Sequence, residues 1–193
     1  MDPIVLQALA KWPNVPHCYG WLGLDARGNW YMRDDRAQAA GPFSAQAGGN
    51  LQSKGSRLQH EKLIEFIQRN YACDDAGQWF FQNGPQRVYV ELEAAPWVWR
   101  LALAETGAHA GSVLVTAHDG RPAKVKACVL DESGRVYLDT DLGFGLVYTQ
   151  DVGVAATAVE SGWWQPEVFE TTKIPVRFKF ELSPISKNAQ IRQ

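Results

Sequence analysis

Residues 71–81 read YACDDAGQWFF, and this pattern decides the fold class. An apolar run meets Asp-x-x-Gly and continues through a polar residue into large apolar side chains. The same order occurs in residues 19–32 (YGWLGLDARGNWYM) and in residues 127–138 (ACVLDESGRVYL). Aspartate accepts hydrogen bonds from its own turn backbone, and glycine tolerates the positive φ of a tight loop. The sequence therefore predicts three β-hairpins, with turns at 25–28, 74–77 and 131–134.

The three similar hairpins raise the question of an internal duplication. Their turn glycines, Gly28, Gly77 and Gly134, are 49 and 57 residues apart. This spacing is too uneven for a tandem array of identical units. Two interpretations stay open at this point: recurrent turn chemistry and an ancient duplication.

The rest of the chain adds strands and a few helices. Alternating apolar and polar residues predict an antiparallel pair at 87–93 and 96–103, a hairpin of 112–117 with 123–130, and strands at 143–148 and 176–182. Apolar stripes and capping residues predict helices at 3–11 and 57–70, and a shorter one from Asp151 to Gly162. We expect a single α+β domain over residues 1–193, with an antiparallel hairpin-rich sheet, two or three covering helices and a frayed polar tail at 184–193.

One long segment is predicted to lack regular structure. Residues 34–55 are rich in alanine, glycine, glutamine and serine, with Gly-Pro at 41–42 and Gly-Gly at 48–49. Loops longer than about 15 residues in a compact domain are usually functional or mobile. This segment is therefore the best candidate for a flap over a site, and mobility alone is the alternative interpretation.

Composition and charge exclude several classes of protein. Hydrophobic residues make up 46% of the chain, which is enough apolar surface for a folded core. A net charge of -2 provides no field for a nucleic-acid backbone or an anionic membrane surface, and we expect neither partner. No stretch approaches the ~20 apolar residues of a membrane span, and the first residues carry no basic leader, which predicts a cytoplasmic protein.

Candidate catalytic and metal-binding residues are few. Cys18, Cys73 and Cys128 are isolated along the chain and the four histidines are scattered, so we expect no metal and no cofactor. The segment LDTDL at 138–142 resembles the aspartate nucleophile motif of haloacid-dehalogenase-like phosphatases, which implies catalysis by Asp139 with magnesium. In that family the motif opens a parallel-sheet domain, whereas here it follows a hairpin. We prefer a turn with solvated acids and assign no catalytic residue.

Tryptophan is the residue that departs most from average composition, with eight copies. Residues 20–31 (GWLGLDARGNWY) resemble one unit of the choline-binding repeats of bacterial wall proteins, whose aromatic side chains cage a quaternary ammonium. Such cages form between consecutive repeats, and the next similar hairpin lies 49 residues further on, which favours a hairpin packed on its neighbours. Aromatic side chains also suit a binding surface. The candidate ligand-binding residues are Trp21, Trp30, Trp97, Trp99, Trp163 and Trp164.

Two longer stretches carry a wider resemblance. They are PHCYGW at 16–21 and WFFQNGPQRVYV at 79–90. Through them the chain resembles a family of small uncharacterised proteobacterial proteins of unknown function. The resemblance implies no activity, cofactor or site.

Three functions remain as hypotheses. The preferred one is a noncatalytic binding or interaction protein, in which the tryptophans face an unknown protein or a small ligand. Its best support is Trp163-Trp164, because neighbouring side chains point to different sides and are rarely both buried. The second is an enzyme in which the 34–55 loop closes over carboxylates such as Asp139 and Asp141. The third is a self-assembling structural protein, for example a homodimer paired through an exposed sheet edge.

Overall fold

The computed structural model describes residues 1–104 and 111–186, which divide into two compact units. The first unit consists of residues 1–25, 29–94 and the C-terminal segment from 179. The second consists of residues 26–28 and 95–178. Each unit has its own sheet and helices, so the predicted α+β class is confirmed. That the whole chain behaves as a single domain stays a prediction.

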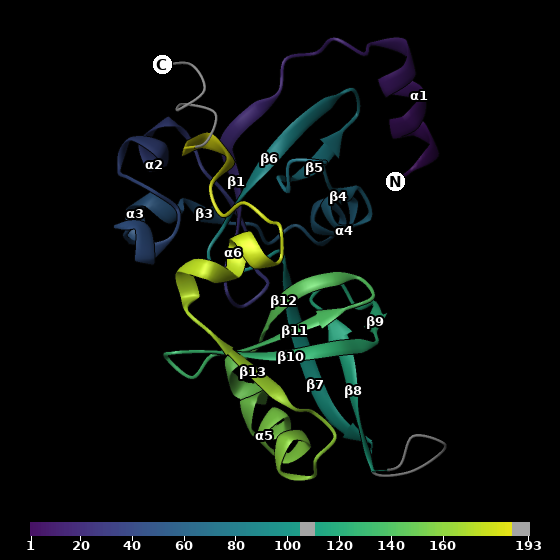
Figure 1. The fold of residues 1–193 in the computed structure, drawn as a ribbon. Coiled ribbons are helices and arrows are strands. Elements are labelled where there is room, and N and C mark those ends of the chain that lie inside the picture. Colours follow the sequence, from purple (N-terminus) through teal and green to yellow (C-terminus); the bar gives the residue numbers. More distant parts are fainter. Residues whose placement is uncertain (105–110, 187–193) are drawn as a thin grey trace. The chain divides into compact units, whose positions relative to one another are not determined.

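A six-stranded sheet forms the centre of the first unit (Figure 1). Its order is β3-β2-β1-β6-β5-β4. The hairpins β1–β2 and β4–β5 are antiparallel, and β1 and β6 join them by a parallel pairing in the middle. The strands are β1 (Cys18–Leu24), β2 (Trp30–Met32), β3 (Ser56–Arg57), β4 (Tyr71–Cys73), β5 (Trp79–Asn83) and β6 (Gln86–Leu92).

Helices α1 to α4 belong to the first unit. The predicted helix at 3–11 is confirmed, whereas the helix predicted from residue 57 begins at Glu61. His60 caps it, because its Nδ1 accepts the N–H of Leu63 at 3.3 Å, and the two residues before Leu58 form an edge strand instead. The helices are α1 (Pro3–Lys11), α2 (Asp35–Ala39), α3 (Leu51–Lys54) and α4 (Glu61–Arg69), with a short 3-10 helix, η1 (Ala45–Ala47).

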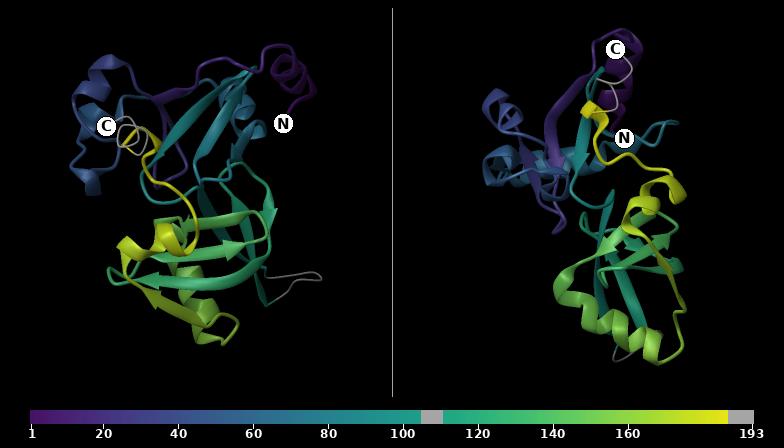
Figure 2. Two further views of the ribbon diagram at one scale, coloured as in Figure 1. Left: turned by 45° about the horizontal axis from the view of Figure 1, so that its top comes forward. Right: turned by 60° about the vertical axis from the view of Figure 1, so that its left-hand side comes forward.

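A seven-stranded sheet forms the second unit, in the order β13-β10-β11-β12-β7-β8-β9. One residue, Lys124, separates β9 from β10, so a nearly continuous strand pairs first with β8 and then with β11. The sheet therefore curls back towards itself, and α5 lies along one side of it (Figure 2). The strands are β7 (Trp97–Ala104), β8 (Ser112–Ala117), β9 (Pro122–Ala123), β10 (Val125–Asp131), β11 (Val136–Thr140), β12 (Gly143–Val147) and β13 (Pro166–Phe169).

The helices of the second unit follow the last long strands. The helix predicted from Asp151 is present as α5, which starts one residue later. Within the described ranges, no helix of the chain is long and apolar enough to cross a membrane. The helical segments of this unit are η2 (Thr149–Asp151), α5 (Val152–Glu160), η3 (Thr171–Lys173) and α6 (Ile174–Arg177).

Two tryptophans fill the core of the second unit. Trp97 and Trp99 are two positions apart on β7, so both point inward, where their rings stack with centroids 6.0 Å apart. The Nε1–H of Trp99 donates to the Leu138 carbonyl at 3.1 Å. Gly145 of β12 makes room for both rings, because a Cβ there would lie 2.5 Å from Trp99 Nε1 and 2.6 Å from Trp97 Cβ. Full burial of one tryptophan removes roughly 200 Å² from water, which is worth about 5 kcal/mol before entropy is considered.

The three predicted hairpins are all present. In each turn the aspartate Oδ1 accepts the N–H of the residue four positions later at 2.8 or 2.9 Å, and the aspartate N–H donates to the carbonyl of that residue. The turn glycines have φ values of 84°, 78° and 81°. The pairs that close the turns are Asp25 with Asn29, Asp74 with Gln78, and Asp131 with Arg135.

The expectation of an antiparallel sheet is wrong in detail, because both sheets are mixed. Parallel pairs join β1 to β6, β7 to β12, and β10 to β13. Their partners are distant in the sequence, whereas hairpin signals report only neighbouring strands. Helices α1 to α6 and η1 to η3 lie within the described residues, which is more than the two or three helices expected.

Four segments differ from their predicted structure. Residues 34–55 contain α2, η1 and α3 rather than an unstructured loop, because Asp34 and Asn50 cap short helices with their side chains. The predicted strand at 176–182 begins as α6, and Lys179 has a left-handed φ of 54°. Strands β6 and β7, predicted to pair, belong to different sheets. In the predicted frayed tail, the Ile185 N–H donates to Glu91 Oε1 at 3.1 Å, and residues 187–193 lie outside the described ranges.

Candidate functional site

The end of α5 positions Trp163 and Trp164. Gly162 has a left-handed φ of 74° and donates its N–H to the Val159 carbonyl at 3.0 Å. The N–H groups of Trp163 and Trp164 both donate to the Ala158 carbonyl, at 2.9 and 3.2 Å. This is the hydrogen-bond pattern of a Schellman motif, which satisfies the last carbonyls of a helix and turns the chain sharply. The two indoles are therefore fixed relative to α5.

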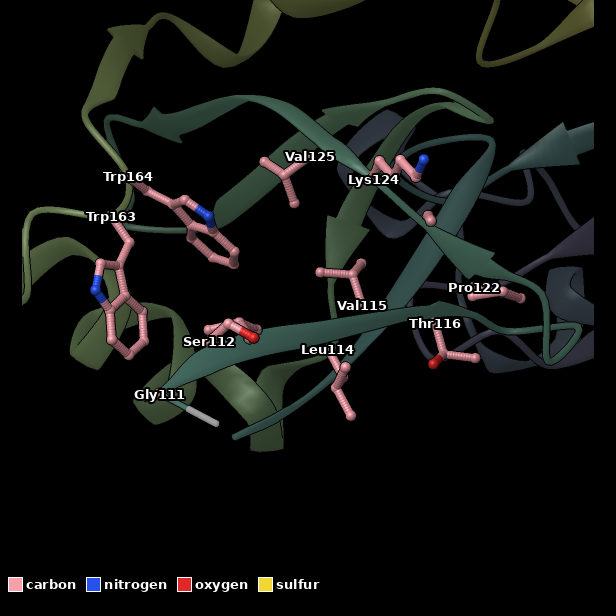
Figure 3. Close-up of a pocket in the computed structure, with 12 residues that line it drawn as sticks. Gly111, Ser112, Leu114, Val115, Thr116, Pro122, Lys124, Val125, Trp163 and Trp164 are labelled. Carbon is pink, nitrogen blue, oxygen red and sulfur yellow. The ribbon is translucent and has the colours of Figure 1, made fainter. Parts of the chain in front are cut away.

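The two tryptophans form one end of a groove of about 530 Å³ beside β8 and the start of β10. Figure 3 shows the Trp164 indole directed towards the space between Val115 and Val125, with Lys124 at the opposite end. Trp163 is 44% exposed, and Leu114 is 46% exposed on the outer side of β8. The groove is lined by residues 111–116, residues 122–125, Trp163 and Trp164, and we call it the tryptophan groove.

Lys124 is the charged residue of the tryptophan groove. Its N–H donates to Asp141 Oδ1 at 2.8 Å, and its carbonyl accepts the Asp141 N–H at 3.1 Å. These bonds fix the backbone at the start of β10, while the Lys124 side chain is exposed. The ammonium forms no ion pair with a carboxylate of the described residues. The groove therefore combines an apolar lining with one positive charge.

The polar side chains that line the groove are the hydroxyls of Ser112 and Thr116 and the ammonium of Lys124. Among residues 1–104 and 111–186, no three His, Cys, Asp or Glu side chains come together as a metal site. Cys128 lies elsewhere in the same unit, and burial raises the pKa of its thiol to about 11, which keeps it protonated at neutral pH. The groove therefore offers a ligand apolar contact, aromatic stacking and one ammonium group that can pair with an anion.

Trp21 lies in a separate apolar groove of the first unit. Its side chain is 45% exposed and borders a space of about 280 Å³ together with Met32 and Phe66. This space lies between the sheet and α4. The exposed tryptophans predicted as ligand-binding residues therefore belong to two different grooves.

The other three candidate tryptophans are interior residues. Trp30 is 1% exposed in the first unit and packs edge-to-face against Tyr71. Trp97 and Trp99 are 3% and 0% exposed in the second. Their positions on strands that alternate inward and outward side chains are the reason, because each lies on the inward face. They present no surface to a ligand.

The two carboxylates considered for an enzyme lie within β11 and directly after it. Asp141 accepts the Lys124 N–H and holds the turn between β11 and β12 against the start of β10. Asp139 lies within β11, in register with Phe144 of β12. Both belong to the second unit, whereas the 34–55 segment belongs to the first.

Several groove residues were missed by the sequence analysis. Ser112, Val115, Lys124 and Val125 read simply as residues of the predicted hairpin of 112–117 with 123–130. The groove forms where the chain stops pairing with β8 and, after Lys124, pairs with β11. Pairing between distant strands has no local sequence signal. The adjacent pair Trp163-Trp164 was the local signal that pointed to this region.

Comparison with known proteins places the chain among proteins without an assigned activity. Residues 1–191 match the family model DUF2944, described as "Protein of unknown function (DUF2946)". No protein with a curated description matches the chain. The predicted resemblance to an uncharacterised family is thereby confirmed.

Two solved structures, both from proteobacteria, are similar to this one. The first is a DUF1285 family protein from Shewanella baltica OS155, at 17% identity and a TM-score of 0.45, covering 71% of this chain and 91% of that one. The second is a DUF1285 family protein from Silicibacter pomeroyi DSS-3, at 12% identity and a TM-score of 0.47, covering 80% of this chain and 83% of that one.

Proposed function

The chain belongs to this family of unknown function, and we propose that it is a noncatalytic binding protein whose ligand occupies the tryptophan groove. One observation carries the proposal: the chain ends α5 with a Schellman motif that holds two adjacent indoles over an open apolar groove. Exposing tryptophan to water is unfavourable, and Trp163 remains 44% exposed although three of the chain's seven other tryptophans are buried. Aromatic side chains held open in this way are typical of contact surfaces.

The lining of the tryptophan groove supports one kind of ligand. A volume of about 530 Å³ lies within the ~300–1,000 Å³ range of pockets for small ligands. The ligand needs an apolar body to contact Trp164, Val115 and Val125. A single negative charge on it would meet the Lys124 ammonium, which lies at the far end of the groove (Figure 3). A flat or extended apolar molecule with one anionic group fits both requirements.

The test uses 8-anilinonaphthalene-1-sulfonate (ANS), a flat apolar anion that fluoresces when it leaves water. We expect saturable ANS binding by the native protein, and loss of one binding site in Trp164→Ala. Trp21→Ala is the matched control, since it removes an exposed indole from the other groove and leaves this site intact. Equal ANS titrations of the native protein and Trp164→Ala would exclude the tryptophan groove as the ligand site.

The cellular location of the protein and the partners that it does not bind are part of the proposal. We place it in the cytoplasm, which is supported by free thiols at Cys18, Cys73 and Cys128. A net charge of -2 argues against nucleic acid and anionic membranes as partners. Fractionation of cells that express a tagged chain tests this location, and recovery of the protein with the membrane fraction would contradict it.

A further inference from the structure

The tryptophan groove lies where two strands of the second sheet separate. Strand β8 pairs with β9 only at Val115 and Thr116, and β10 then turns away to pair with β11. On its other edge, β10 meets β13 only from Cys128 onward. Within the described residues, the near end of β8 and the first residues of β10 therefore have no strand neighbour on the side of the groove.

Backbone groups of Val113 and Val125 face this gap. Ala117 donates its N–H to the Arg121 carbonyl at 2.8 Å, so its backbone faces the β9 side. The backbone groups of strand residues two positions apart point to the same side, so those of Val115 and Val113 also face the β9 side. On β10, the Lys124 carbonyl accepts the Asp141 N–H from the β11 side, so Val125 faces away from β11. Two valines thus present N–H and C=O groups to the groove from opposite walls.

The edge of β8 lacks the usual protection against strand pairing. Native proteins commonly protect exposed edges with charges or proline. The outer strand at the opposite end of the sheet order follows this rule, because β13 begins at Pro166 and carries Glu167. Strand β8 instead reads SVLVTA, uncharged and rich in β-branched residues. An unprotected edge beside two indoles has the character of a pairing site.

We propose that the ligand of the tryptophan groove is an extended peptide segment of a partner protein, which adds as a short strand to the open edge of β8. The inference rests on the proposed function and specifies its ligand. Backbone groups of the peptide pair with Val113, and its apolar side chains contact Trp163 and Trp164. A carboxylate of the peptide, from a side chain or a C-terminus, meets the Lys124 ammonium, the positive charge of the groove.

The open backbone groups of Val113 favour a peptide over a simple amphiphile. A fatty or aromatic anion would contact the indoles but would leave the N–H and C=O groups of Val113 without partners as it excluded water. Leaving such groups unpaired in a closed site is unfavourable. A peptide strand satisfies them while it fills the same apolar space. Strand addition therefore accounts for the open backbone edge, the indoles and the lysine together.

The experiment selects peptides from a displayed library of random nonapeptides on the full-length native protein. The best peptide is then synthesised in two forms, one unmodified and one with N-methylated alternate residues that cannot donate to a strand. Binding is measured by quenching of intrinsic tryptophan fluorescence. Two variants accompany the native protein. Val113→Pro removes the outward N–H at an edge position that proline tolerates, and Val113→Ala is the matched control, which keeps this N–H.

We expect Val113→Pro and the N-methylated peptide each to weaken binding about tenfold, since one backbone hydrogen bond is lost. Val113→Ala should change the affinity much less. Retained ANS binding and an unchanged circular dichroism spectrum show that Val113→Pro is folded.

Other outcomes overturn the inference in distinguishable ways. If ANS binds at Trp164 but no peptide is enriched over Val113→Pro, the proposed function stands and strand addition is wrong. The same holds if the N-methylated peptide binds equally well. If neither ANS nor any peptide binds this groove, both proposals fail. A concentration-dependent dimer that Val113→Pro dissociates would mean that the edge pairs with a second copy of this chain and not with a partner.

Discussion

Asp131 offers the sharpest test of how these hairpins are stabilised. Its side chain is fully buried and receives hydrogen bonds from the Ser133 and Arg135 N–H groups, from both their side chains, and from Tyr137 and Thr171. Burial alone raises the pKa of this carboxyl, but the bonds from Ser133 and Arg135 and the charge of Arg135 outweigh it and lower the pKa from 3.8 to about 2. The folded state therefore strongly favours the carboxylate.

The magnitude follows from linkage between ionisation and folding. A pKa lowered from 3.8 to about 2 contributes about 2.4 kcal/mol of stability at neutral pH. Because the folded pKa is the lower one, this contribution is fully present above the unfolded pKa. It is lost as the pH falls through the folded value, and about half has gone by pH ~3. Asp131→Asn should lower the free energy of unfolding by about 2–3 kcal/mol at pH 7 and by clearly less at pH 3.

Urea unfolding of both proteins at pH 7 and pH 3, followed by circular dichroism, measures the difference. Asp74→Asn is the matched control, because Asp74 closes the equivalent turn of the β4–β5 hairpin and, among the described residues, no arginine forms an ion pair with its carboxylate. We expect a smaller loss there. If Asp131→Asn has the same effect at both pH values, the carboxylate's charge is not what stabilises the turn, and the reasoning is wrong.

Three further predictions follow from packing and topology. Gly145→Ala should lower the free energy of unfolding by about 3 kcal/mol in the same urea assay, because the added Cβ would lie 2.6 Å from Trp97 Cβ. In Gly153→Ala, within α5, the added Cβ meets no atom within 4 Å, and the free energy of unfolding should rise by up to about 1 kcal/mol. Glu91→Ala should destabilise by about 2 kcal/mol, because it removes the acceptor of the Ser183 hydroxyl at 2.6 Å and of the Ile185 N–H at 3.1 Å, while Glu91→Gln retains an acceptor and changes stability little. If the chain is a single domain, tryptophan fluorescence and far-ultraviolet circular dichroism should report one coincident urea transition, and two separate transitions would refute this.

The parts of the fold that the sequence predicted are those held by local bonds. The three Asp-x-x-Gly turns are each closed by hydrogen bonds across four residues, so the turn motif alone identifies them. Helix α1 was predicted equally well because Pro3 occupies its first turn. The parallel pairs were not predictable in this way, since strand β10 and its partner β13 are separated by two strands and a helix. No local pattern encodes which strand lies beside which.

Burial explains why only some of the candidate tryptophans are surface residues. Trp97 and Trp99 are spaced by two, and this period places both on the inward face of β7. Trp163 and Trp164 are adjacent and follow the glycine that ends α5, so no regular face can bury both. Spacing therefore separates interior from surface aromatics, whereas tryptophan content alone does not. Applied strictly, this rule removes Trp97 and Trp99 from the candidate site.

The tryptophan groove depends on one feature that the local sequence encodes and on one that arises from pairing between distant strands. Gly162 ends α5 and fixes where the indoles leave the helix, and this could be read from the sequence. The gap they face exists because the chain after Lys124 exchanges β8 for β11 as its partner, and the bonds between Lys124 and Asp141 enforce that exchange. Asp141, one of the carboxylates considered for an enzyme, makes these bonds to the Lys124 backbone. By holding the start of β10 against β11, it keeps the β8 edge open beside the tryptophans.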